Sequence, residues 1–206
     1  MPNRLFALFL TYSRSAVFGV ALGTIVWFGW AFFHRTFHLY RSLAKIVALC
    51  FAICFCLLFD QYIQRGGIVN YNKTVQYSDQ VRLDAQSTAI EMIKDYPLSG
   101  VGFQQFSSMG EKYGHPIGTH NIYLFLFSEM GLIAFLAFVV FIVIVLKNAL
   151  KLSFSPQNAS LISIFIAFLF IGGCDFYLIT FQQGKLMFFI SAALIVAMAK
   201  QKETLC

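Results

Sequence analysis

Charged residues are scarce in this chain, and their scarcity argues against a soluble domain. Only 12% of the 206 residues are charged, 59% are hydrophobic, and the mean hydropathy is +0.73. Soluble domains average about 25% charged and about 45–50% apolar residues. A domain of this length could not bury so large an apolar excess. The composition, with its long apolar runs, predicts an all-α integral membrane protein.

Familiar catalytic and metal-binding motifs are also missing. The sequence has no P-loop, no Gly-x-Ser-x-Gly, no His-Glu-x-x-His and no internal repeat. Its five cysteines form no Cys-x-x-Cys pair, so we expect them to be small apolar filler. The net charge of +6 comes without a basic groove interleaved with aromatic residues. We therefore expect no cofactor, no metal and no nucleic-acid partner.

Apolar runs, by contrast, are abundant. A helix needs about 20 apolar residues to cross a bilayer, and we expect about five such helices. A shorter run at 4–12 is interpreted as the remnant of an earlier helix. The predicted spanning segments are residues 15–33, 43–59, 122–146, 159–181 and 186–199.

The basic residues predict how these helices are oriented. The two short connections and the C-terminal tail together hold seven bases and one acid, which is typical of cytoplasmic segments. Residues 60–119 hold six of the nine acids and five bases, as expected of a translocated loop. We predict two membrane helices within 1–59, a periplasmic loop domain over 60–119, and three membrane helices with a cytoplasmic C-terminus over 120–206.

The loop is predicted to contain a helix. Ser78 and Asp79 are good N-cap residues, and Tyr96-Pro97 should end the helix because the residue before proline avoids the α region. A glycine-containing turn is expected over 99–106. The apolar stripe of this helix consists of Leu83, Ile90 and Ile93.

Several polar residues are predicted to lie at the outer face of the membrane. Arg14, Arg82, His120, Asp175 and Lys185 all fall at that level in the topology above. Each alone has an ordinary interpretation: a snorkelling cation, a helix cap, or, for Asp175, a helix break or membrane boundary. Together they suit a phosphate-bearing lipid, because arginine binds phosphate through a planar fork of donors and histidine accepts a proton near neutral pH.

Glu129 is the ionisable residue expected deepest in an apolar segment. It lies nine residues after His120, about 13 Å along a helix. On a straight helix this spacing places the two side chains on opposite faces, so they are not expected to share a site.

Three stretches resemble a known family. They are LTYSRSAVF (10–18), RLDAQSTAIEMIKDYPLSGVGFQQF (82–106) and HNIYLFLFSEMGLIAF (120–135). In this order and spacing they are similar to the C-terminal half of the O-antigen ligase and O-antigen polymerase superfamily. That superfamily consists of bacterial polytopic glycosyltransferases of the GT-C type. The likeness covers roughly residues 5–195.

The resemblance implies a reaction and a place. Such enzymes move a glycan from an undecaprenyl-diphosphate carrier to a sugar hydroxyl at the periplasmic face of the inner membrane, without a metal. Arg14 and Arg82 would then hold the diphosphate, and His120 would orient or deprotonate the acceptor hydroxyl. Asn121, expected to cap the following helix, and Lys185 complete the predicted substrate-binding set. By the same likeness, Glu129 and Gly131 are expected to serve helix packing.

Several alternatives stay open at this point. Family members have about twice as many membrane segments, so we expect a partial form whose partner is a separate N-terminal half. The acceptor is either a lipid A–core sugar, as for a ligase, or another glycan repeat, as for a polymerase. A transporter or flippase subunit and a non-catalytic membrane scaffold are the competing functions.

Overall fold

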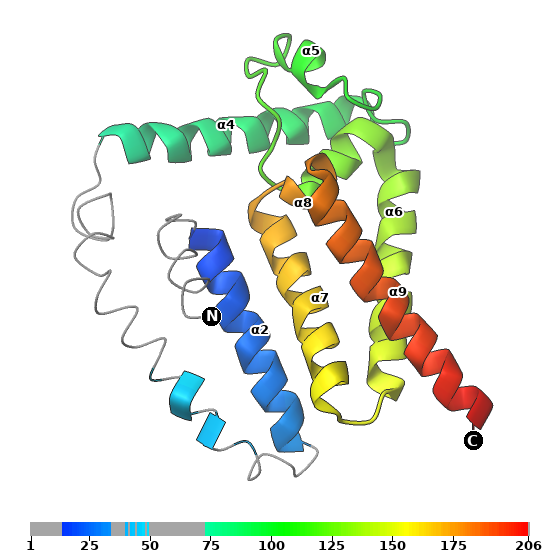
Figure 1. Cartoon of the computed structure of the whole chain (residues 1–206). Helices are drawn as coiled ribbons and strands as arrows, with labels where there is room; N and C mark the ends of the chain where they lie inside the picture. The colour runs from blue at the N-terminus through cyan, green and yellow to red at the C-terminus, as the bar shows by residue number, and fades with distance from the viewer. Residues whose placement is uncertain are drawn as a thin grey trace.

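The computed structural model describes residues 14–33, isolated positions between 40 and 49, and residues 73–205. These residues form helices and no strand, in agreement with the predicted all-α class (Figure 1). The predicted spanning segment 43–59 lies largely outside the described residues, and the run at 4–12 lies wholly outside them.

Three long helices are apolar enough to cross a membrane: α6 (Ile122–Lys151), α7 (Pro156–Cys174) and α9 (Gln182–Leu205). A fourth, α2 (Arg14–Phe33), contributes a shorter apolar stretch over Phe18–Phe33. These helices form one bundle, which confirms the membrane-protein class (Figure 1).

Two helix boundaries differ from those predicted. α7 begins at Pro156, before the expected residue 159, because the Ser155 side chain accepts a hydrogen bond from the Asn158 N–H at 3.1 Å. Proline at the first helical position costs no hydrogen bond, so this start is favourable. α9 is longer than the predicted 186–199, since polar residues at both ends continue the helix.

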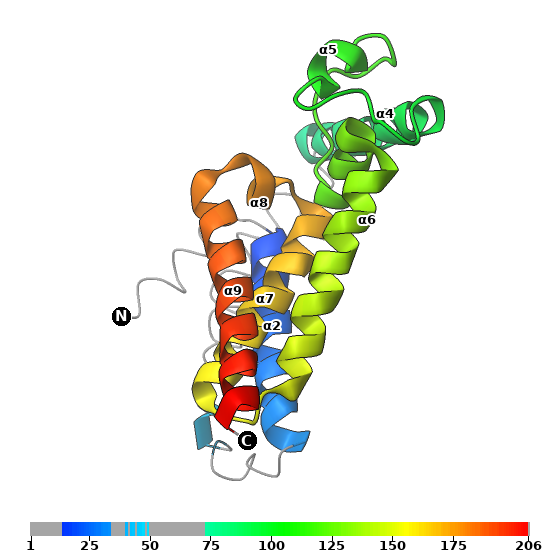
Figure 2. The same cartoon turned by 90° about the vertical axis from the view of Figure 1, so that its right-hand side faces the viewer.

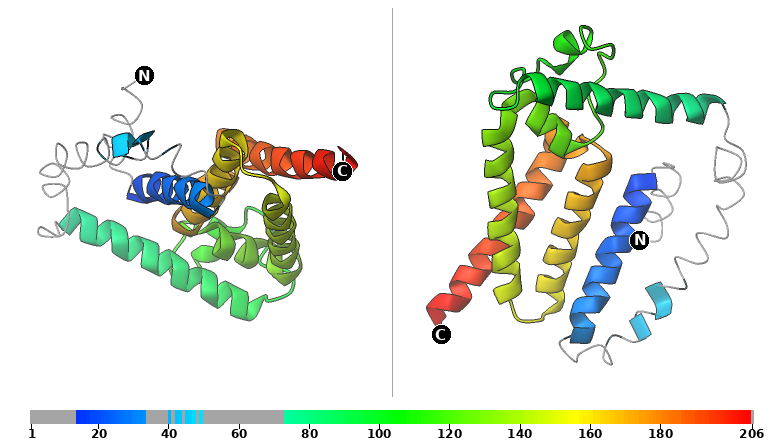
Figure 3. Two further views of the ribbon diagram at one scale, coloured as in Figure 1. Left: turned by 90° about the horizontal axis from the view of Figure 1, so that it is seen from below. Right: turned by 180° about the vertical axis from the view of Figure 1, so that it is seen from behind.

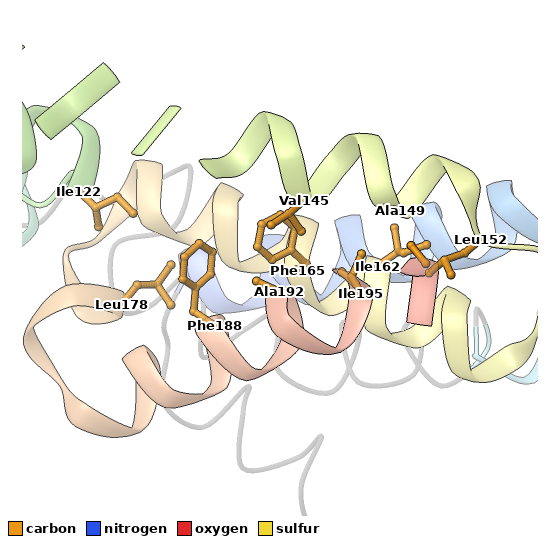
Figure 4. Close-up of a cluster of buried hydrophobic side chains, with 11 residues drawn as sticks. Ile122, Val145, Ala149, Leu152, Ile162, Phe165, Leu178, Phe188, Ala192 and Ile195 are labelled. Atoms are coloured by element: carbon orange, nitrogen blue, oxygen red, sulfur yellow. The ribbon is translucent and has the colours of Figure 1, made fainter. Parts of the chain in front are cut away.

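The core lies between α6, α7 and α9. Phe165 of α7 and Phe188 of α9 stack with their ring centroids 5.2 Å apart. Small residues on α9 allow the helices to approach, as Ala192 does (Figure 4). Figure 4 shows the whole buried cluster: Ile122, Val145, Ala149, Leu152, Ile162, Phe165, Leu178, Phe188, Ala192, Ile195 and Ala199.

α2 packs against α7 through glycines. A Cβ on Gly19 would lie 2.7 Å from the side chain of Ile171, and a Cβ on Gly23 would lie 3.3 Å from the Ser163 carbonyl oxygen. Small residues permit close helix contact in membranes, where van der Waals packing supplies much of the association energy. The Gly-x-x-x-Gly spacing in α2 therefore fixes this helix on the bundle.

α6 is not a straight helix, which corrects the prediction of one straight spanning segment. Gly131 has φ 76° and ψ −177°, so the helix is broken there (Figure 1). The part that follows, residues 132–151, is about 30 Å long and is by itself sufficient to cross a bilayer. The part before the break, residues 122–130, packs against the ends of α7 and α8 (Tyr177–Thr180).

The predicted loop helix exists as α4 (Lys73–Asp95) and runs across one end of the bundle (Figures 1 and 2). It begins five residues earlier than expected, so Ser78 and Asp79 lie within the helix and do not cap it. It ends before Tyr96-Pro97, as predicted. The short helix α5 (Phe106–Gly110) follows and lies on the side of α4 away from the bundle.

Candidate active site

His120 and Asp175 come from separate segments and meet at the end of the bundle nearest α4. The His120 Nδ1 atom lies 3.6 Å from the Asp175 Oδ1 atom. Asp175 is placed by the end of α7, where its extended backbone stops the helix and its N–H bonds to the Ile171 carbonyl at 2.8 Å. Asp175 therefore marks a helix end, one of the interpretations its position in the sequence allowed.

The surroundings of His120 determine which part of its imidazole ring is exposed to solvent. The Nδ1 atom is buried, whereas the side chain as a whole is 25% exposed. The exposed part therefore belongs to the rest of the ring. The ring of Phe176 packs on the imidazole with centroids 4.8 Å apart. The Asp175 carboxylate lies on the Nδ1 side of the ring, beyond hydrogen-bond distance, so the exposed nitrogen is Nε2.

The segment before α6 is held rigidly. The Asn121 side chain accepts hydrogen bonds from the N–H groups of Tyr123 at 2.9 Å and Leu124 at 3.2 Å, which confirms the predicted cap. The Tyr123 hydroxyl donates to the Leu169 carbonyl at 2.8 Å and ties this turn to α7. Because His120 directly precedes the cap, its backbone is fixed relative to Asp175.

Two of the stretches singled out in the sequence meet in space. Residues 97–106 lie against residues 128–132, and we call this contact the loop–helix junction. The Glu129 side chain is 1% exposed, and its two oxygens accept hydrogen bonds from the N–H groups of Gln104 at 2.8 Å and Phe106 at 3.1 Å. Backbone bonds of 2.9 Å join Val101 to Ser128, Gly102 to Glu129 and Leu132 to Pro97.

The junction requires glycine on both sides. Gly100 has φ 68° and Gly131 has φ 76°, and a Cβ on either residue would overlap backbone atoms of the opposite segment. Glu129 and Gly131 were expected to serve helix packing. Their contacts instead break α6 and attach the loop to it. Gln104, at φ 60°, is the one non-glycine residue with positive φ in the described part of the chain, and its N–H is held by Glu129.

The loop is also fastened to α4. The Tyr113 hydroxyl donates a hydrogen bond of 2.5 Å to the Asp95 carboxylate. This bond, assisted by burial, raises the pKa of Tyr113 to about 12. The Thr88 hydroxyl donates to the Tyr113 carbonyl at 3.5 Å. Residues 106–115 are therefore anchored both to α4 and, through Phe106, to α6.

The predicted cations occupy the same end of the bundle. α2 begins at Arg14 near that end, and Lys185 lies exposed in the first turn of α9 (Figure 1). Arg82 is half-buried in α4 and has no ion-pair partner among the described residues. The structure brings His120 together with Asp175, but it records no contact between His120 and the three cations within the described ranges.

Comparison with known proteins identifies the family. The sequence pattern of the O-antigen ligase family matches residues 4–139, which is more than half of the chain. The chain belongs to the O-antigen ligase family. No curated protein and no solved structure gave a significant match. Membership makes the chain a membrane protein of a ligase- and polymerase-type glycosyltransferase family.

In this O-antigen ligase family member, the matched range contains Arg14, Arg82, His120 and the whole loop–helix junction. Asp175 lies beyond that range. Sequence reasoning placed Asp175 at the same level as His120 but did not pair the two residues. The available signal was an acid directly after the apolar run that contains Gly172-Gly173, since such a residue must end a helix or find a cationic partner.

Glu129 should contribute to the stability of the ligase-family fold. Replacing Glu129 by alanine leaves the Gln104 and Phe106 N–H groups without their acceptor, and buried unsatisfied donors cost about 1–3 kcal/mol each. We expect a lower melting temperature in detergent and faster trypsin cleavage of the 97–115 segment. Glu111→Ala, at an exposed position, is the matched control. Equal melting of the two variants would contradict the role of Glu129.

Proposed function

We propose that this protein transfers a glycan from an undecaprenyl-diphosphate carrier to a sugar hydroxyl at the periplasmic face of the bacterial inner membrane. The observation that carries the proposal is the His120–Asp175 pair, held at the end of the bundle where the loop domain lies. Family membership supplies the class of chemistry.

In this reaction His120 takes the proton of the acceptor hydroxyl on its exposed nitrogen. The acceptor oxygen then forms a bond to the anomeric carbon of the glycan, and the bond between that carbon and the diphosphate oxygen breaks. Asp175, whose carboxylate lies 3.6 Å from Nδ1, stabilises the positive charge that forms on the ring. The carrier leaves as undecaprenyl diphosphate.

Arg14, Arg82 and Lys185 are proposed to bind the diphosphate. Guanidinium groups hold phosphate oxygens in two-point contacts and stabilise the charge that develops on the leaving group. The reaction balances without a metal, because the diphosphate leaves as an anion and the acceptor proton moves to His120. Metal independence is tested by adding a chelator to the transfer reaction, which should leave the rate unchanged.

An apolar groove suggests where the hydrocarbon chain of the carrier lies. The groove, about 400 Å³ in volume, lies beside the contact of α2 with α7 and is lined from these helices and by Leu43 and Val47. Because α2 and α7 belong to the apolar bundle, a groove along them suits an isoprenoid chain. It extends to Ser160 near the start of α7, toward the end of the bundle away from α4.

The competing transporter function loses its main support. It rested on Glu129 as an ionisable group within a membrane segment. The Glu129 carboxylate binds two loop N–H groups at the loop–helix junction, so a structural role accounts for it. A non-catalytic scaffold remains the alternative that the following experiment excludes or supports.

Complementation tests the function. The chain is expressed in cells that lack the matching glycan transferase, and surface glycan and carrier-linked glycan are measured on gels. We expect the chain to restore attached glycan, and Arg82→Ala to lower it about tenfold or more with accumulation of carrier-linked glycan, because the diphosphate loses a charged donor. Lys94→Ala, which removes another cation of α4, should restore glycan normally.

The outcomes separate the alternatives. Attachment of single repeats with loss of long chains in the Arg82 variant would indicate a polymerase, and loss of all attached glycan would indicate a ligase. An inserted wild-type chain that restores nothing would indicate that it requires a separate N-terminal half. Unchanged glycan in Arg82→Ala would support the scaffold and contradict the proposed role of this residue.

A further inference from the structure

Within the part of the chain that the structure describes, one side of α4 carries exposed apolar side chains. The opposite side packs on the loop and on α6 through Ala85, Ala89 and Met92, all fully buried. Leu83 is 58% exposed and Ile90 is 44% exposed. With 100° of rotation per residue, these two side chains project about 130–155° from the centre of the buried side. They are two turns apart and therefore form one exposed stripe.

Charges are segregated around the same helix. Asp84, Glu91 and Asp95 fall within an arc of about 40°, on the side where Asp95 accepts its hydrogen bond from Tyr113. Lys94 is exposed and projects about 20–40° from the Leu83–Ile90 stripe, whereas Arg82 is half-buried and projects about 80–100° from it, toward the buried side. α4 thus has an acidic side next to the overlying loop. Its apolar side, with Lys94 beside it, faces away from the loop.

The orientation of α4 shows what that second side faces. α4 runs across the helices of the bundle, at the level where they end (Figures 1 and 2). Seen from below, most of α4 lies outside the outline of α2, α7 and α9 (left panel of Figure 3). The side of α4 that faces away from the loop is therefore not covered by α2, α7 or α9 over most of its length.

We propose that α4 is a membrane-surface helix. Leu83 and Ile90 enter the boundary between lipid headgroups and acyl chains, and Lys94 contacts lipid phosphates beside them. An amphipathic helix with a base beside its apolar face binds an anionic interface in this manner. The acids remain on the far side, where lipid phosphates would repel them. This surface is distinct from the glycan-transfer chemistry and requires no acceptor or carrier.

Photo-crosslinking tests the proposal on the full chain. A benzophenone amino acid is placed singly at Leu83 or Ile90, or at two exposed control positions, Glu91 on the acidic side of the same helix and Glu111 in the overlying loop. The protein is reconstituted in vesicles of phosphatidylethanolamine and phosphatidylglycerol at a 3:1 ratio, and lipid adducts are quantified by mass spectrometry. A label at Ile133, 74% exposed on the spanning part of α6, calibrates the yield.

We expect labels at 83 and 90 to give lipid adducts with yields near that of position 133, and about tenfold above those of 91 and 111. Equal yields at 83, 90 and 91 would overturn the proposal. So would adducts of 83 and 90 with protein instead of lipid, since another segment would then cover the stripe. Neither result depends on whether the chain transfers glycan.

Discussion

Replacing His120 by alanine is expected to lower the rate of glycan transfer by about 10²–10⁴-fold, the usual contribution of a general base. The imidazole lies 3.6 Å from the Asp175 carboxylate. Within the described ranges, no other histidine lies within 4 Å of a carboxylate oxygen. The measurement is the initial rate of transfer by purified protein from carrier-linked glycan to acceptor. His115→Ala removes a second histidine of the same loop and should retain most of the activity.

The pairing with Asp175 gives this prediction a second test. Asp175→Asn keeps the size of the side chain but removes the charge that stabilises imidazolium, so we expect a smaller loss than for His120→Ala. Because the two residues act as a unit, the double variant should be no slower than His120→Ala alone. Additive losses would contradict a shared role, and a His120→Ala protein with half the normal rate would exclude His120 as the base.

Replacing Gly131 by alanine is expected to have the largest effect on stability. The backbone at φ 76° and ψ −177° lies in a region used almost only by glycine, where another residue costs about 1–3 kcal/mol. An alanine Cβ would also overlap the Leu98 carbonyl oxygen. We expect a total loss of about 3 kcal/mol or more, and a fall in melting temperature of roughly 6–12 °C in detergent.

A matched substitution isolates this effect. Gly29 lies in α2, and a Cβ there would meet no atom within 4 Å, so Gly29→Ala should not lower the melting temperature. Gly100→Ala, on the opposite side of the loop–helix junction, should destabilise the protein as Gly131→Ala does. A Gly131→Ala protein that melts with the wild type would show that α6 continues as a straight helix through this position.

Local rules predicted much of the fold because they depend on adjacent residues. Long apolar runs specify spanning helices wherever they occur, and the described bundle contains four of the predicted segments as helices. Asn121 caps α6 because its side chain reaches N–H groups only two and three residues away. Pro97 restricts the preceding residue, so the end of α4 was predictable as well.

Predictions failed where distant contacts outweigh local preference. Ser78 and Asp79 are good caps, but α4 continues through them to Lys73. α6 has the composition of an uninterrupted helix, yet the loop–helix junction supplies hydrogen bonds that replace those lost at the break. No periodicity within residues 122–146 could reveal this, because the bonding partners lie about 25 residues earlier in the chain.

The sequence by itself determined the class of the protein, its family, and the residue types capable of phosphate binding and proton transfer. These follow from composition and from short motifs, which need no knowledge of distant neighbours. Only the tertiary structure decided that Asp175 lies against His120, and that Glu129 serves the loop–helix junction instead of a membrane-buried site. The reason is physical: the role of a buried polar group is set by the partner that satisfies it, and packing brings that partner from elsewhere in the chain.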